Sequence, residues 1–185
     1  MNRLDDAYFA RVYADGPDPW GFETKWYEKR KYALTMASLP RERYRRAFEP
    51  GCANGVLTAL LAARVDELVS LELMPAIARH AQARAPSADV RVGALPEAFP
   101  GGRFDLVVAS EVLYYLRPEG LETVLASLES ALEEDGHLVA VHWRLETDYP
   151  QTGDAVHARL RETPFLRPLH HYEQREFQLD VLERR

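Results

Sequence analysis

Phe48-Glu49-Pro50-Gly51-Cys52-Ala53-Asn54-Gly55 is the stretch of this 185-residue chain that decides its fold. Ala47-Phe48-Glu49 predicts the end of a short strand, and residues 56–64 after the stretch predict a helix. Between them, small residues at alternate positions allow a sharp backbone turn and let a ligand approach the chain closely. The stretch therefore predicts a strand–turn–helix unit with a ligand-binding turn.

Strand and helix patterns continue to alternate toward the C-terminus. We expect strands at 67–73, 90–92, 104–110 and 137–143 and helices at 75–84 and 121–132, with Gly136 placed for the C-cap of the second helix. This alternation predicts a mainly parallel sheet with helices on both faces, and right-handed crossovers make the layout doubly wound. A helix over 154–162 and strands over 165–171 and 176–183 are expected to close one sheet edge as a hairpin.

Residues 1–46 differ in composition from the rest of the chain, because they are rich in aromatic and charged side chains. Two helices, at 4–13 and 24–38, are expected on either side of the turn Gly16-Pro17-Asp18-Pro19. We expect one domain over residues 1–185, in which residues 1–46 form a helical cap or lid and residues 47–185 form a Rossmann-like α/β core.

Composition narrows the class of protein. The net charge is −6 and basic residues occur only in short clusters, which argues against nucleic acid as a partner. Cys52 is the single cysteine, so an internal disulfide is excluded and a reducing compartment is expected. Residues 1–10 do not resemble a signal peptide and no apolar run is long enough to span a bilayer, so we expect a cytoplasmic protein without membrane contact. The oligomeric state stays open.

A second acidic residue gives the turn a chemical partner. Glu72 ends the second predicted strand, 21 residues after Gly51, and a carboxylate in this position can accept hydrogen bonds from both hydroxyls of a ribose. The alternative is a polar strand end without a ligand. The spacing Glu-x-Gly-x-Ala-x-Gly is not the dinucleotide fingerprint G-x-G-x-x-G, which argues against a nicotinamide-dependent oxidoreductase.

Four segments in order resemble the motifs of class I S-adenosylmethionine-dependent methyltransferases. They are residues 49–55, Glu72, Gly93-Ala94-Leu95-Pro96 and residues 104–111. The resemblance implies a seven-stranded sheet with its last strand antiparallel, S-adenosylmethionine as cofactor and S-adenosylhomocysteine as product. No metal is expected, because the histidines have neither a cysteine partner nor a second suitably spaced histidine. Ala53 replaces a more usual glycine, and Ala94 stands where many members have an aspartate that binds the adenine amino group.

The candidate cofactor-binding residues follow from these motifs and from the N-terminal segment, which we expect to act as a lid over the methionine end of the cofactor or only to cover the sheet. They are Trp20, Tyr27, Glu49, Gly51, Cys52, Ala53, Gly55, Glu72, Leu73, Met74, Gly93, Ala94, Leu95, Ser110 and Glu111. Arg30 and Lys31 are further candidates for the cofactor carboxylate, if they are not simply solvated.

Three further segments resemble the nodulation protein S family in particular. They are Asp18-Pro19-Trp20, residues 26–32 with Trp26-Tyr27-Glu28 and Lys31-Tyr32, and Ser110-Glu111-Val112-Leu113-Tyr114-Tyr115-Leu116. That family methylates the free amine of a glucosamine residue in a deacetylated chitin oligosaccharide. The resemblance implies a small-molecule amine as acceptor, although relatives on one scaffold commonly differ at the acceptor site.

Candidate acceptor-side residues follow the fourth and fifth strands. Glu111 and His142 are candidate bases that orient an amine and take its proton, although Glu111 could instead contact the cofactor or cap a helix. Tyr114, Tyr115 and Trp143 offer aromatic faces to an acceptor or pack in the core. The alternatives to N-methylation are a small-molecule O-methyltransferase and a non-catalytic cofactor-binding module.

Overall fold

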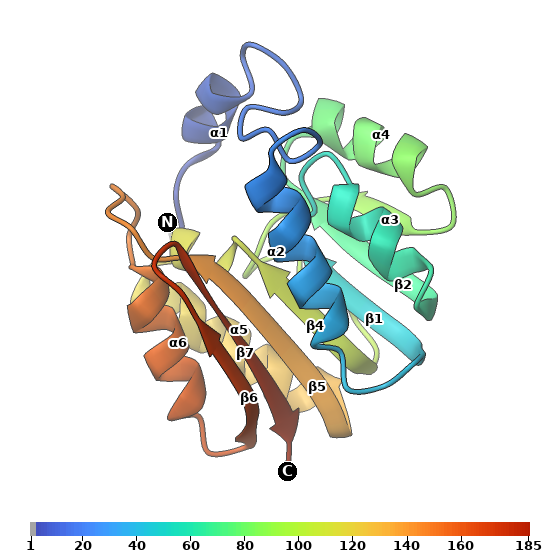
Figure 1. Ribbon diagram of the computed structural model, residues 1–185, viewed down its shortest axis with the longest axis vertical. Coiled ribbons are helices and arrows are strands. Elements are labelled where there is room, and N and C mark those ends of the chain that lie inside the picture. The colour runs from blue at the N-terminus through green and yellow to red at the C-terminus, as the bar shows by residue number, and fades with distance from the viewer. Residues whose placement is uncertain (1–2) are drawn as a thin grey trace.

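The computed structural model describes residues 3–185, so residues 1–2 of the expected cap lie outside the described residues. The elements in chain order (Figure 1) are α1 (Asp6–Val12), α2 (Trp26–Ala37), β1 (Tyr44–Pro50), α3 (Val56–Ala62), β2 (Val65–Glu72), α4 (Pro75–Arg84), β3 (Asp89–Val92), β4 (Phe104–Ser110), a 3₁₀ turn η1 (Leu113–Tyr115), α5 (Pro118–Ala131), β5 (Leu132–Trp143), α6 (Gly153–Arg161), β6 (Leu166–Glu173) and β7 (Phe177–Arg184).

The strands form one seven-stranded sheet in the order β3-β2-β1-β4-β5-β7-β6. Pairing is parallel from β3 through β5, and β7 runs antiparallel to both of its neighbours. This confirms the expected mainly parallel, doubly wound sheet with an antiparallel last strand. The order reverses between β1 and β4, and ligands of open α/β sheets bind beyond the carboxyl ends of the strands at such a point.

Helices cover both faces of the sheet because the central strands are apolar on both sides. Along β4, Leu106 and Val108 join a buried cluster with α2 and α3, whereas Val107 and Ala109 join a second cluster with α5 and α6. Successive side chains of a strand point to opposite faces, so one run of apolar residues serves both layers. In Figure 1, α2 and α3 lie in front of the sheet and α5 lies behind it. No helix within residues 3–185 is both long and apolar enough to cross a bilayer.

The expected helix C-cap at Gly136 is wrong. Helix α5 ends at Ala131, its cap is Leu132, and β5 begins at that same residue. Leu132 pairs with Phe104 before the register shifts, so the segment containing Gly136 is an irregularity inside β5. The left-handed backbone conformation falls on Asp135, with a φ of 58°.

Candidate functional site

A cavity of about 540 Å³ lies where the carboxyl ends of β1, β2 and β4 meet the N-terminal segment. The sequence-predicted residues that line it are Trp20, Tyr27, Glu49, Gly51, Cys52, Ala53, Glu72, Leu73, Gly93, Ala94, Leu95, Ser110, Glu111, Tyr114, Tyr115 and Trp143. Their positions at the ends of neighbouring strands bring together motifs that are far apart in the chain.

The first turn needs its glycine for two reasons. Gly51 has a φ of 71°, and a Cβ atom there would lie 2.9 Å from the Val112 side chain. The loop therefore passes close to the segment after β4, and Cys52 N–H anchors it by donating to Leu71 O at 2.8 Å. Ala53 also takes a positive φ, of 47°, which a residue with a side chain adopts only under local strain. The turn is a tightly specified wall of the cavity.

Gly55 and Met74 do not line the cavity, contrary to expectation. Gly55 caps α3 with a φ of 81°, and a Cβ atom on it would lie 2.7 Å from Ala81 Cα, so its role is close packing of α3 on α4. Met74 contributes its backbone, because its N–H donates to Glu72 Oε1 at 2.8 Å.

Glu72 ties the two neighbouring strand ends together. Its Oε1 atom accepts a hydrogen bond from Met74 N–H, which follows β2. Its Oε2 atom accepts one from Ala53 N–H, which follows β1, at 3.1 Å. Burial raises the pKa of this carboxyl to about 7. An ionised carboxylate has about four acceptor positions, so two remain for donors of a ligand in the cavity. Glu49, at the end of β1, is also buried and accepts from Ser70 Oγ at 2.9 Å, and burial raises its pKa to about 7.

Glu111, directly after β4, has all of its carboxylate held by protein groups. Lys31 Nζ donates to Oε1 at 2.7 Å, while Tyr114 Oη and Trp143 N–H donate to Oε2 at 2.7 and 2.9 Å. Its own N–H donates to Val141 O, and its φ is 54°. The carboxylate thus fastens helix α2 to the ends of β4 and β5.

Lys31 is not solvated, as one sequence interpretation allowed. Its side chain is 2% exposed, and its ammonium lies 2.7 Å from Glu111 Oε1 and 2.9 Å from Glu28 Oε2. Burial acts to lower the pKa of this lysine, but the two carboxylates outweigh that effect and hold the pKa above its usual value. Arg30 points elsewhere and donates to Gln174 and Tyr172.

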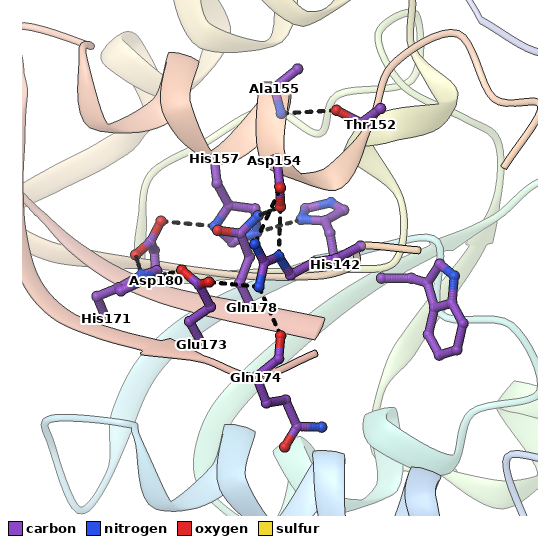
Figure 2. A network of polar contacts seen from close by, with 12 residues as sticks. His142, Thr152, Asp154, Ala155, His157, His171, Glu173, Gln174, Gln178 and Asp180 are labelled. Carbon is purple, nitrogen blue, oxygen red and sulfur yellow. Dashed lines mark hydrogen bonds and ion pairs between the residues drawn. The ribbon is translucent and has the colours of Figure 1, made fainter. Parts of the chain in front are cut away.

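The expectation that His142 faces an acceptor does not hold in this structure. Its ring is fully buried, does not line the cavity and accepts from Leu113 N–H at Nε2, at 3.1 Å. A neutral His142 therefore carries its proton on Nδ1, which lies 2.9 Å from His157 Nε2. His157 Nδ1 in turn lies 2.8 Å from Asp180 Oδ2, so the three side chains form a directed chain inside the fold (Figure 2).

Asp180 is the end of this chain and is fully buried on β7. Its Oδ2 atom also accepts a hydrogen bond from Arg161 at 2.7 Å, and its Oδ1 atom is hydrogen-bonded to His171 Nδ1 at 2.7 Å. Burial acts to raise the pKa of Asp180, but its two histidines and Arg161 together hold the pKa below its usual value. Burial also holds the pKa of His142 well below its usual value. His142 thus stabilises the 3₁₀ turn η1 by accepting from Leu113 N–H, and it does so behind the residues that line the cavity.

An aromatic wall lines the part of the cavity where the sequence predicts the acceptor. The ring centroids of Tyr114 and Tyr115 are 4.6 Å apart, and each lies 4.8 Å from the centroid of Tyr149. Phe9 of α1 packs edge-on against Tyr115 at 5.1 Å. The cavity residues that sequence reasoning missed are Arg3, Phe9, Tyr13, Phe22, Lys25, Glu28, Tyr32, Leu57, Val112, Leu116, Thr147, Tyr149 and Glu176. The aromatic richness of residues 1–46 was the available signal for several of them.

The family model described as nodulation protein S (NodS) matches residues 9–147. Nodulation protein S of Sinorhizobium fredii is 32% identical over 127 residues, which cover 66% of this chain and 59% of the relative. Nodulation protein S of Bradyrhizobium diazoefficiens is 30% identical over 132 residues, which cover 66% of this chain and 61% of the relative. The chain thus spans about three fifths of the length of the curated relatives it matches.

Two solved structures extend this likeness. A candidate methyltransferase from Pseudomonas syringae is 44% identical with a TM-score of 0.76, and the match covers 86% of this chain and 100% of that one. The N-methyltransferase NodS from Bradyrhizobium japonicum, solved in complex with S-adenosylhomocysteine, is 24% identical with a TM-score of 0.86 and shares the fold over 97% of this chain and 99% of that one. Motifs, fold and family model agree, and this chain belongs to the nodulation protein S family.

Proposed function

We propose that this chain is an S-adenosylmethionine-dependent methyltransferase whose acceptor is a small molecule, the amine of an amino sugar or of a similar metabolite. The observation that carries the proposal is Glu72, a buried carboxylate at the cavity whose two remaining acceptor positions suit the two hydroxyls of a ribose. Membership of the nodulation protein S family supports it, and so does the S-adenosylhomocysteine bound in the Bradyrhizobium japonicum structure.

The residues of this chain fit such a cofactor. The first turn presents only small residues to the cavity, Gly51, Cys52 and Ala53, and Gly93, Ala94 and Leu95 give a small, mainly apolar wall beside Glu72. We assign the ribose to Glu72, the base to residues 93–95, and the methionine part to the first turn and to Trp20 and Tyr27, which also line the cavity. The cofactor supplies a methyl group already activated by positive sulfur, so the protein mainly positions the nucleophile and excludes water.

Replacing Glu72 with glutamine tests the cofactor assignment. Titration calorimetry should show saturable binding of S-adenosylhomocysteine to the unaltered protein and about tenfold to hundredfold weaker binding to Glu72→Gln, because hydrogen bonds to an ionised acceptor are lost. With a pKa of about 7, Glu72 is more fully ionised at pH 8 than at pH 6, so affinity should rise over that interval. Glu67→Gln, on the exposed part of β2, is the matched control and should bind normally. Absence of heat with both S-adenosylmethionine and S-adenosylhomocysteine would overturn the assignment.

The alternative acceptor is a hydroxyl group. With S-adenosylmethionine present, a glucosamine disaccharide should gain one methyl group on nitrogen, located by fragmentation in mass spectrometry. Methylation of hydroxylated metabolites alone would make the protein an O-methyltransferase and leave the cofactor assignment standing. Cofactor binding without a methylated product from either class would favour a non-catalytic module.

A further inference from the structure

Glu28 differs from Glu72 and Glu111 because, within residues 3–185, its one polar contact is the ion pair with Lys31. Glu111 accepts three hydrogen bonds and Glu72 accepts two, all from groups of the protein. Glu28 is 6% exposed and lines the same cavity, and its buried Oε2 atom has no well-aligned hydrogen bond from the part of the chain that the structure describes. Its polar neighbour is the Lys31 ammonium, 2.9 Å from Oε2.

The charges around Glu28 do not cancel. Lys31 is one positive charge placed between Glu28 and Glu111, so the three groups carry one negative charge in excess when both carboxylates are ionised. Glu111 already accepts three hydrogen bonds, whereas Glu28 contacts only Lys31, so there is more room for another cation at Glu28. Burial holds the pKa of Glu28 above its usual value in spite of the neighbouring Lys31 ammonium.

Tyr27, the preceding residue, adds an independent observation. Its hydroxyl is buried at the cavity without a hydrogen-bond partner among the residues that the structure describes. Its ring lies 5.2 Å from Lys31 Nζ and packs edge-on against Trp143 at 5.7 Å. Aromatic faces, an unpaired hydroxyl and an undersatisfied carboxylate together form a site of the kind that binds organic cations.

We propose that Glu28 binds the acceptor as an ammonium ion and takes a proton from it. In this step an N–H bond of the ammonium breaks, an O–H bond forms on the Glu28 carboxylate, and the electron pair stays on nitrogen, which becomes a neutral nucleophile. Glu111 is then a positioning residue, since it holds Lys31 and with it the place of Glu28. The inference rests on the proposed function and names the residue that selects amines at that site.

Amine binding can be measured apart from turnover. In the presence of saturating S-adenosylhomocysteine, a glucosamine disaccharide should bind at least about tenfold more weakly to Glu28→Gln than to the unaltered protein, because a charge-assisted contact is lost. The N-acetylated disaccharide, which has no ammonium, should not distinguish the two proteins. Glu42→Gln, exposed just after α2, is the matched control and should bind the amine normally. Glu28→Asp, which keeps the charge, should retain part of the affinity.

The pH profile adds a second readout. The charged groups that face Glu28 are Lys25 before α2, Lys31 on α2 and Glu111 after β4. Because an ionised carboxylate is the form that binds an ammonium, amine affinity should rise with pH up to the pKa of the amine itself. Glu28→Gln should flatten this rise.

The outcomes separate the inference from the proposed function. Equal amine affinity in Glu28→Gln and the unaltered protein, with S-adenosylhomocysteine still bound by both, overturns the role of Glu28 alone. A parallel loss of S-adenosylhomocysteine affinity in Glu28→Gln and Glu28→Asp also overturns it, because the effect is then structural. Failure of the unaltered protein to bind S-adenosylhomocysteine overturns the proposed function itself.

Discussion

Lys31→Met is expected to lower the free energy of unfolding by about 3–5 kcal/mol at pH 8, the range typical of a buried ion pair broken on one side. The substitution leaves the Glu28 and Glu111 carboxylates buried beside each other without their shared cation. It also removes the link between α2 and the ends of β4 and β5. Urea denaturation followed by circular dichroism measures the loss.

The sign of the pH dependence provides a further check on Lys31→Met. Without the ammonium, burial and mutual repulsion raise the pKa values of the two carboxyls above those of the unfolded chain. The folded state then binds more protons than the unfolded state at intermediate pH, so its stability falls as pH rises. The deficit should therefore be larger at pH 8 than at pH 5. Lys29→Met, on the exposed side of α2, should change stability by no more than about 0.5 kcal/mol. A deficit independent of pH would contradict the electrostatic explanation.

Asp180→Ala should be comparably damaging, also by about 3–5 kcal/mol, because it removes the buried acceptor of three side chains. Arg161 and His157 lose a charged partner, and the chain of hydrogen bonds through His142 to Leu113 loses its terminal carboxylate. Thermal and urea unfolding both report the effect.

The matched control for Asp180→Ala is Glu122 on α5, which, like Asp180, pairs with an arginine of helix α6. Arg159 pairs there with Glu122, whose side chain is 53% exposed, and Glu122→Ala should cost less than about 1 kcal/mol. Equal losses for the buried and the exposed carboxylate would show that the chain of histidines does not stabilise the fold.

The sheet and the first turn are predictable from sequence because their signals are local. The apolar run of residues 104–110 and the glycine spacing at Gly51 depend on backbone geometry that neighbouring residues impose. Glu72 follows as well, since the carboxyl ends of adjacent parallel strands meet at one edge of the sheet.

The part of the cavity that we assign to the acceptor was less predictable, because its contacts join segments that are distant in the sequence. Strand periodicity shows that neighbours such as His142 and Trp143 point to opposite faces, but not which of them faces the cavity. The structure turns Trp143 to the cavity and His142 into the protein. Glu28 and Lys31 lie on a helix whose seating on the sheet depends on Glu111, 80 residues after Lys31. No local sequence pattern indicates that two residues so far apart in the chain form an ion pair.

The ion pair between Lys31 and Glu111 restricts which part of the chain can move to open the cavity. Helix α2 cannot move away from the sheet without separating the buried Lys31 ammonium from the Glu111 carboxylate, so it forms a fixed wall of the cavity. If the N-terminal segment opens the cavity as the sequence predicts, the movement is limited to residues before Trp26, where Leu4 N–H donates to Tyr115 O at 2.9 Å and Glu23 pairs with Arg84. The hinge of such a movement lies near Lys25, the N-cap of α2, three residues before Glu28, which we assign to the acceptor.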